Sequence, residues 1–208
     1  MPATFIPSIT IIEAIASPEE LDFINALRGL SEDFEVYYQP VTNINHVDLA
    51  ILRHGAGLML VEISSVNIED CEIIDKDEKE YFKNNQTGMK SLSPFERVVD
   101  FKNEFFDTLS IELFSNKYVA GQMQYYGLIK TAVYMPGSSL KNLKTAYGDR
   151  NRINDYRIYG KKDDKYTRAF ISCDLDWIRG KVEQALRLNE DGENLFTDDI
   201  YNSLHNIL

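Results

Sequence analysis

Hydrophobic residues near the start of the chain recur first with the spacing of a helix and then with that of a strand. The sequence at 17–20, Ser-Pro-Glu-Glu, predicts a helix start in which Ser17 is the N-cap and Glu20 completes a capping box. Apolar residues then recur every three positions until a glycine follows at 29. Residues 34–41 are rich in aromatic and β-branched side chains, which predicts a strand.

Two apolar runs on either side of a short loop around Gly55 predict a β-hairpin. A hairpin that is symmetric about Gly55 pairs residues whose numbers add to 110, so Asp48 faces Glu62. Because successive side chains of a strand alternate between its faces, Ser64 is expected on the same face as Glu62. A register shifted by one residue, or a carboxylate turned to solvent, is the alternative.

The second half of the chain continues the alternation of helices and strands. A second capping box, Ser-Pro-Phe-Glu at 93–96, predicts a helix to about residue 113, and Lys102 falls on its apolar stripe. The acidic segment 67–81 before it is interpreted as a solvated excursion. The other expected elements are a strand over 125–134, a short strand at 170–171, a helix from Ser172 and, after a polar linker, a short helix capped by Thr197.

The composition is that of one folded α/β domain, which we expect over residues 1–188. Residues 189–208 are expected to form a linker and a short helix that could lead to another domain. Hydrophobic residues make up 44% of the 208 and aromatic residues 12%, which suffices for a core. The first 16 residues contain no Lys or Arg, unlike a secretory signal, and no apolar run is long enough to span a membrane. Two cysteines suit a reducing, cytoplasmic location and make a zinc site unlikely to form.

Charge is distributed unevenly along the chain. The net charge is −11, which is the wrong sign for a nucleic-acid-binding protein, yet residues 138–168 contain nine basic and four acidic side chains. Tyrosines alternate with these basic residues, as in segments that contact phosphates and exposed bases, although an ordinary solvated loop has the same composition. The candidate phosphate contacts are Lys141, Lys144, Arg150, Arg152, Arg157, Lys161 and Lys162.

The facing carboxylates of the hairpin are the strongest chemical signal. Two like charges directly opposite one another on a strand pair, about 5 Å apart, destabilise the sheet. A divalent cation between Asp48 and Glu62 would reverse that effect, and hard carboxylate oxygens suit Mg²⁺ or Mn²⁺. Such an ion polarises a phosphodiester and activates a water molecule.

The order of these elements resembles the NERD (nuclease-related) domain of the PD-(D/E)XK, or restriction-endonuclease-like, superfamily. The likeness covers about residues 17–188 and rests on an ordered set of features more than on any single motif. Those features are the helix with Glu20, the strands with Asp48 and with Glu62-Ile63-Ser64, the Ser-Pro helix start at 93–96, the late strand IKTAVYMPG at 129–137 and the helix start CDLDW at 173–177.

The resemblance implies a restriction-endonuclease-like core, with a mixed central sheet flanked by helices, and metal-dependent cleavage of DNA. Asp48 and Glu62 match the family's metal ligands, Glu20 its helix-borne acid and Ile63 the residue after the second acid. DNA is then the expected partner. A helicase domain or partner and self-association are the other partners considered.

One departure from the family pattern bears directly on activity, because Ser64 stands where the family has a lysine. That lysine stabilises negative charge and orients the attacking water, and serine carries no charge. Three explanations are open. The role of this lysine has migrated to Lys102, with Arg97 and Lys90 as weaker candidates. Alternatively, the domain has lost catalysis and kept DNA binding or assembly, or Ser64 is an engineered change. Lys102 could equally be a lysine that reaches past apolar neighbours to water.

Overall fold

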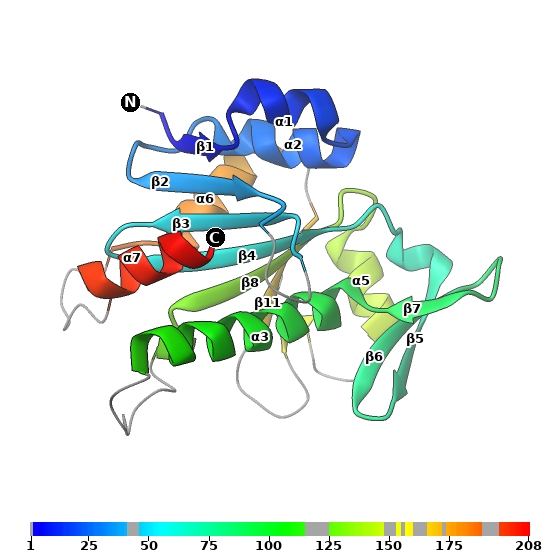
Figure 1. Cartoon of the computed structure of the whole chain (residues 1–208). Helices are drawn as coiled ribbons and strands as arrows, with labels where there is room; N and C mark the ends of the chain where they lie inside the picture. Colours follow the sequence, from blue (N-terminus) through cyan, green and yellow to red (C-terminus); the bar gives the residue numbers. More distant parts are fainter. Residues whose placement is uncertain are drawn as a thin grey trace.

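The computed structural model shows a mixed α/β architecture in which helices cover both faces of one large sheet and a small second sheet lies beside it (Figure 1). It describes residues 2–40, 46–114, 125–147, 153–154, 157–159, 166–171, 174–188 and 196–208, without the side chains of 111–114, 153–154, 157–159 and 166.

The large sheet has eight strands in the order β1-β2-β3-β4-β8-β11-β10-β9. They are β1 (Thr4–Ile6), β2 (Phe34–Tyr38), β3 (Leu49–Arg53), β4 (Gly57–Ile63), β8 (Ile129–Tyr134), β11 (Tyr166–Phe170), β10 (Arg157–Tyr159) and β9 (Ile153–Asn154). The pairs β1–β2, β4–β8 and β8–β11 are parallel and the others antiparallel, so the sheet is mixed as expected. The segment before residue 17 belongs to the fold, because β1 is one of its strands.

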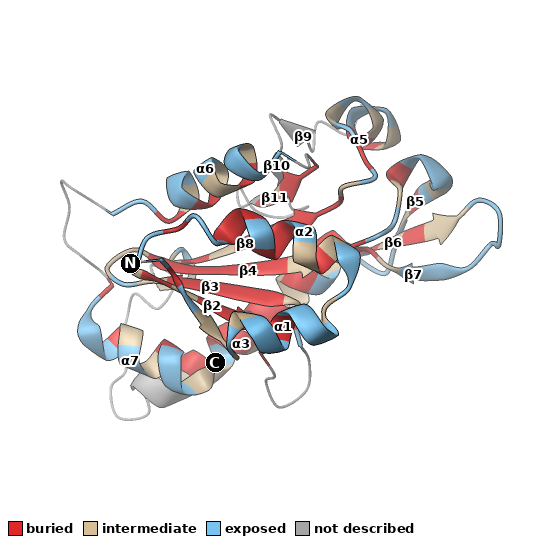
Figure 2. Ribbon diagram, turned by 90° about the horizontal axis from the view of Figure 1, so that it is seen from above, coloured by how far each residue is buried: buried red, intermediate tan, exposed pale blue. Residues whose placement is uncertain are grey.

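Alternation of side chains gives this sheet two apolar cores. Leu49 and Ile51 pack on the face covered by α1 (Ile9–Ile15), α2 (Pro18–Leu27) and α6 (Leu175–Ala185). Ala50 and Leu52 pack on the face covered by α3 (Pro94–Phe114), α5 (Leu140–Tyr147) and α7 (Asp198–Ile207). The central strands are therefore buried from both sides (Figure 2), which explains why β3 and β4 read as continuous apolar runs.

The β3–β4 hairpin has the register that the sequence predicts. Leu49 faces Val61 and Arg53 faces Gly57, so the paired numbers add to 110. Gly57 has a φ of +140°, and a Cβ at this position would lie 2.5 Å from the carbonyl oxygen of Leu128. Glycine is therefore required where the hairpin turns back beside β8.

The acidic segment after β4 is not a solvated excursion. It forms η1 (Ile68–Asp70) and a three-stranded antiparallel sheet of β5 (Cys71–Lys76), β6 (Lys79–Asn84) and β7 (Lys90–Leu92). Ile73 and Phe82 are buried on its inner face, where Phe82 contacts Phe95 at the start of α3. The apolar and charged residues of these strands alternate with a period of two, and the charged side chains occupy mainly the outer positions. The many charges made this strand pattern hard to recognise in the sequence.

The helix starts are partly as predicted. Ser17 and Glu20 form the complete capping box, with Glu20 Oε2 accepting from the Ser17 N–H at 2.6 Å. Ser93 Oγ accepts from the N–H of Glu96 at 3.1 Å, but the Glu96 carboxylate accepts from the N–H of Glu80, on β6, instead of returning to Ser93. That bond attaches the small sheet to α3.

The last two helices begin close to their expected positions. The N-cap of α6 is Asp174, whose Oδ1 accepts from the N–H groups of residues 176 and 177, whereas the expected start at Ser172 lies outside the described residues. Thr197 is the N-cap residue of α7 as predicted, and Ile200 and Leu204 pack that helix onto the core beside α3.

None of the helices in the described part of the chain is long and apolar enough to cross a membrane.

Candidate active site

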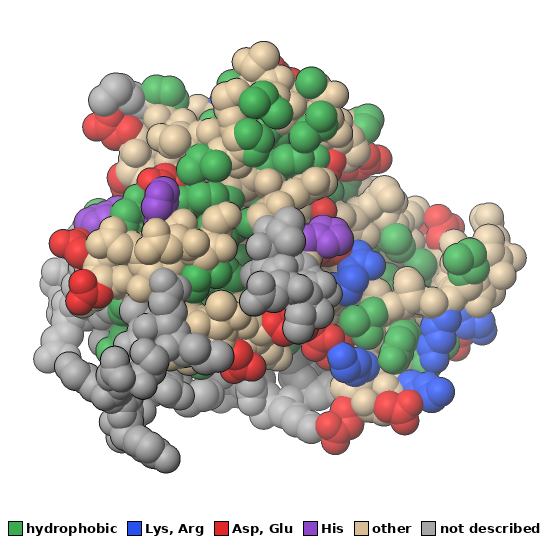
Figure 3. All heavy atoms as spheres, viewed as in Figure 1, with side chains coloured by type: hydrophobic (Ala, Val, Ile, Leu, Met, Phe, Trp, Pro, Cys, Tyr) green, Lys and Arg blue, Asp and Glu red, His purple; other side chains and the backbone are tan. Residues whose placement is uncertain are grey.

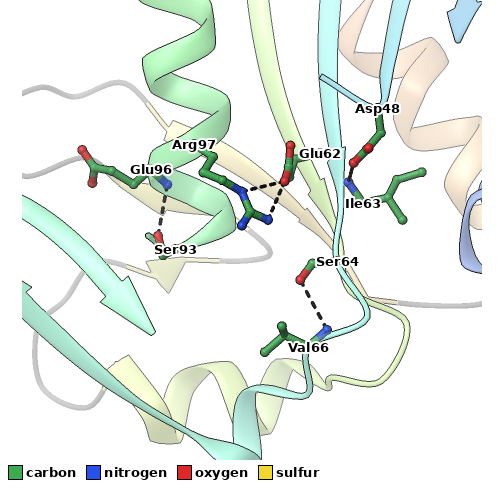
Figure 4. A network of polar contacts seen from close by, with 8 residues as sticks. All are labelled: Asp48, Glu62, Ile63, Ser64, Val66, Ser93, Glu96 and Arg97. Carbon is green, nitrogen blue, oxygen red and sulfur yellow. Dashed lines mark hydrogen bonds and ion pairs between the residues drawn. The ribbon is translucent and has the colours of Figure 1, made fainter. Parts of the chain in front are cut away.

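Asp48 lies where the ladder between β3 and β4 ends. The last paired residues are Leu49 and Val61, and beyond them the Asp48 carboxylate accepts a hydrogen bond from the N–H of Ile63, with 2.5 Å between Oδ2 and N (Figure 4). The carbonyl of Asp48 accepts from the N–H of Gln39 at 2.8 Å. Asp48 Oδ2 therefore takes the place of the backbone carbonyl that would continue the hydrogen-bond ladder, and this bond fixes the carboxylate at the strand end.

Glu62 faces α3 from the penultimate position of β4. Its side chain is 13% exposed, and its Oε1 lies 2.7 Å from Nε and 2.5 Å from Nη2 of Arg97, in the first turn of α3 (Figure 4). The guanidinium itself is 43% exposed. Glu62 is thus oriented by a cation that remains accessible to solvent.

Glu20 approaches the same strand end from α2. Its side chain is buried at 9% exposure, and its two oxygens accept from Ser17 and, at 3.4 Å, from Gln39 Nε2. Burial, with the nearby charges of Glu20 and Asp48, raises the pKa of Tyr38 to about 12. The helix-borne acid is therefore within electrostatic reach of Asp48 while also capping its own helix.

The surroundings oppose the ionisation of both hairpin carboxylates. Burial raises the pKa of Asp48, and the charge of Glu20 adds to that effect, against the Ile63 N–H bond that lowers it. Burial likewise raises the pKa of Glu62, and the charge of Asp48 adds to it, although Arg97 lowers it. In both cases the net pKa is raised, chiefly because burial disfavours the charged carboxylate.

His46 is an additional basic group at this site. It is exposed, two residues before Asp48, and its charge lowers the pKa of both Asp48 and Glu62. Its position two residues from Asp48 was the only sequence signal for it.

Ser64 and Lys102 occupy other environments. Ser64 is buried, its Oγ accepts from the N–H of Val66 at 3.3 Å, and it therefore stabilises the turn after β4 (Figure 4). The Lys102 ammonium lies 3.7 Å from the ring centroid of Tyr126. The structure thus directs Lys102 at an aromatic ring and brings Arg97 to Glu62.

Only part of the basic segment can be placed. Lys141 and Lys144 are exposed on α5, where with Leu140 and Thr145 they line a surface hollow of about 450 Å³. Arg157 lies in β10, and its side chain is outside the described residues, as are the whole residues Arg150, Arg152, Lys161 and Lys162.

The donor set at the hairpin fits a hard divalent cation. No group of three or more His, Cys, Asp or Glu side chains in the described ranges is close enough to hold a metal ion, so the pair stands by itself. Asp48 Oδ1 and Glu62 Oε2 accept no hydrogen bond from the described residues. Mg²⁺ is commonly held by one or two carboxylates, with waters and substrate phosphates completing its shell.

Comparison with known proteins adds no relative: no family model matches the chain, and no characterised protein or solved structure is significantly similar to it.

Proposed function

We propose that this chain is a divalent-metal-dependent nuclease that hydrolyses phosphodiester bonds of DNA at the Asp48–Glu62 pair. The observation that carries the proposal is the convergence of two half-buried carboxylates with raised pKa values at one strand end, next to an arginine. Neighbouring acids with perturbed pKa values do not stabilise a fold, and they are typical of functional sites. The element order α2-β2-β3-β4-α3-β8 supports a restriction-endonuclease-like core.

Asp48 and Glu62 are the residues that would hold Mg²⁺ or Mn²⁺, through the oxygens that accept no hydrogen bond. When bound, the ion would polarise the phosphodiester and lower the pKa of a coordinated water. The Ile63 N–H fixes the Asp48 carboxylate, and Arg97 fixes that of Glu62. Pre-orientation of this kind lowers the cost of assembling the site when substrate arrives.

Arg97 is the residue proposed to supply the charge that Ser64 lacks. A guanidinium does not lose its proton in a protein, so its role is to stabilise negative charge on the phosphate and not to act as a base. Its exposure leaves donors available to a substrate while Glu62 holds its Nε and Nη2. Glu20, through its charge, supports a cation at Asp48.

A second candidate function is a non-catalytic module that binds DNA or mediates assembly within a larger, helicase-type protein. The favouring observation is that Ser64 is buried and engaged in a turn, while the charge of Arg97 is already balanced by Glu62. Lys141 and Lys144 would then serve as phosphate contacts, with or without cleavage.

Cleavage assays separate the two candidates. Wild-type protein is expected to cut single- or double-stranded DNA with Mg²⁺ or Mn²⁺, and Asp48→Ala and Glu62→Gln to abolish cutting. Glu13→Gln is the matched control, because Glu13 is an exposed acid on α1, paired with Arg28, and belongs to neither proposed site. Arg97→Ala should lower the rate by about 10²–10³-fold, as loss of one transition-state donor does.

Absence of cutting across several divalent metals would contradict the nuclease proposal and favour the second candidate. In that event Ser64→Lys tests lost catalysis directly, since a gain of cleavage identifies the missing charge as the cause.

A further inference from the structure

The outer face of the three-stranded sheet carries an apolar row that crosses all three strands. Its inner face is defined by the buried residues Ile73 and Phe82, which face one another. Tyr81 therefore points outward, and it faces Ile74 on β5 and Leu92 on β7. All three residues of this row are half-buried, so part of a tyrosine ring is available at the centre of the sheet.

Two pairs of lysines lie on the same face, one at each end of this row. Lys76 faces Lys79 across β5 and β6, and Lys83 faces Lys90 across β6 and β7. Like charges directly opposite in a sheet are destabilising, so neither pair is explained by the stability of the sheet. An anionic ligand over this face would convert both repulsions into attractions.

The lysines are held in place by exchangeable partners. Lys79 pairs with Asp100 at 2.6 Å and Lys83 with Glu72 at 3.1 Å, and these side chains are between 31% and 57% exposed. The Lys90 ammonium lies over the Tyr81 ring, 4.6 Å from its centroid, so it moves from the ring to a phosphate when a base stacks there. Exposed ion pairs contribute little to stability, so phosphates can replace these carboxylates at small cost.

The face also differs in charge from the chain as a whole. Its four lysines outnumber by one the acids that pair with them, Glu72, Asp77 and Asp100, whereas the chain as a whole carries −11. Figure 3 shows Lys and Arg side chains, with hydrophobic ones among them, gathered at the lower right, where Figure 1 places β5–β7.

We propose that the outer face of β5–β7 binds single-stranded nucleic acid. Tyr81 stacks on an unpaired base, and the two lysine pairs contact the phosphates on either side. A flat sheet face with a central ring suits a single strand, because the bases of a duplex are already stacked and paired. The inference rests on the proposed function in taking the bound polymer to be the one that the site would cleave.

Binding is measured in chelator, where no metal-dependent cleavage interferes. The probe is a fluorescein-labelled oligothymidine, compared with a duplex of the same length by fluorescence anisotropy. Lys83→Gln/Lys90→Gln is expected to weaken binding about tenfold and to reduce the slope of log affinity against log salt by about 1.4, or roughly 0.7 per contact. Tyr81→Leu, which keeps the row apolar, should also weaken binding about tenfold, with less change in the salt slope.

Lys181→Gln is the matched control, because Lys181 likewise lies over an aromatic ring, 5.7 Å from that of Trp177, but on α6. It should bind as the wild type does. Unchanged binding by Lys83→Gln/Lys90→Gln, or tighter binding of the duplex than of the single strand, would overturn the inference. Loss of binding only in Lys141→Gln/Lys144→Gln would overturn it too and assign binding to α5.

The two proposals fail in different ways. Protein that binds the oligonucleotide in chelator and cuts nothing with metal contradicts the nuclease and supports the binding face. Protein that cuts, with unchanged binding in the double lysine variant, contradicts the binding face alone.

Discussion

Replacing Asp48 by asparagine separates the charge of this side chain from its hydrogen bond. Asparagine keeps an oxygen that can accept from the N–H of Ile63, so the strand end retains its acceptor. The substitution removes the negative charge that burial, and the charge of Glu20, disfavour at this position. We therefore expect Asp48→Asn to stabilise the fold while it eliminates the proposed activity.

The size of the effect follows from burial and from the charges near Asp48, because the paired register ends at Leu49–Val61 and the Asp48 carboxylate is turned toward Ile63. Two unit charges about 5 Å apart repel by about 3 kcal/mol at an effective dielectric constant near 20, which sets the scale for one neighbouring carboxylate such as Glu20. His46 and Arg97 offset part of the penalty at Asp48, and a neutral acceptor binds the Ile63 N–H less strongly than a carboxylate does. A net gain of about 1 kcal/mol remains, which corresponds to a rise in Tm of roughly 2–4 °C for a chain of this size.

Thermal and urea unfolding of three variants test this reasoning. Asp48→Ala also removes the charge but leaves the Ile63 N–H without its acceptor, which costs about 1–3 kcal/mol, so it should be less stable than Asp48→Asn. Asp33→Asn is the matched control. Burial raises the pKa of Asp33, but bonds from Ser31 and Arg53 lower it overall, so this substitution should destabilise the fold.

The pH dependence supplies a second check on the same variant. A carboxyl whose pKa is raised by folding makes the folded state less stable as pH rises through that raised value, and the penalty is absent below its unfolded pKa. The advantage of Asp48→Asn should therefore be present at neutral pH and vanish in acid. A lower Tm for Asp48→Asn than for the wild type at neutral pH would refute the argument that Asp48 is retained at a cost to stability.

Three further predictions concern the metal and two other positions. A saturating Mn²⁺ concentration, about 100 times Kd, should stabilise the wild type by about 2.7 kcal/mol and have little effect on Asp48→Asn, as measured by thermal shift. Burial raises the pKa of Glu35, but hydrogen bonds from Tyr201, Tyr37 and His205 lower it overall. The lowered pKa stabilises the fold at pH values above the unfolded pKa, and this stabilisation is lost as the pH falls through the folded pKa. Glu35→Gln should therefore lower Tm at neutral pH, by an amount equivalent to about 1 kcal/mol, and flatten the acid side of a Tm–pH profile. Gly57→Ala should lower the urea midpoint by the equivalent of at least about 2 kcal/mol, because its Cβ would collide with the carbonyl of Leu128 at a positive φ.

The hairpin was predictable because its register depends on local information. A short glycine turn and two apolar runs fix which residues face each other, and the observed pairs follow that arithmetic through Leu49. The arithmetic does not say where the regular ladder stops. Asp48 lies one residue beyond it, so its carboxylate turns into the line of the backbone bonds and accepts from Ile63 instead of standing on the sheet face.

Other features depended on tertiary contacts that no local pattern contains. Lys102 and Arg97 both lie on α3, and the sequence marked Lys102 as unusual because it interrupts an apolar stripe. That stripe is buried, and the ammonium is accommodated there by the ring of Tyr126, which lies 24 residues away in the chain. Arg97 is unremarkable in the sequence, yet the first turn of α3 places it beside the end of β4.

The same physical criterion identifies both proposed sites. A folded chain gains nothing from holding like charges at facing positions, so such a pair indicates a ligand of opposite charge unless nearby counter-charges cancel the repulsion. At Asp48 and Glu62, burial keeps both pKa values raised although Arg97 lowers them, so the charged forms of both carboxylates remain disfavoured without a cation. At Lys83 and Lys90, Glu72 balances only one of the two charges with an ion pair. The two sites have opposite signs, as a nuclease requires if one surface holds the polymer while the other holds the cation.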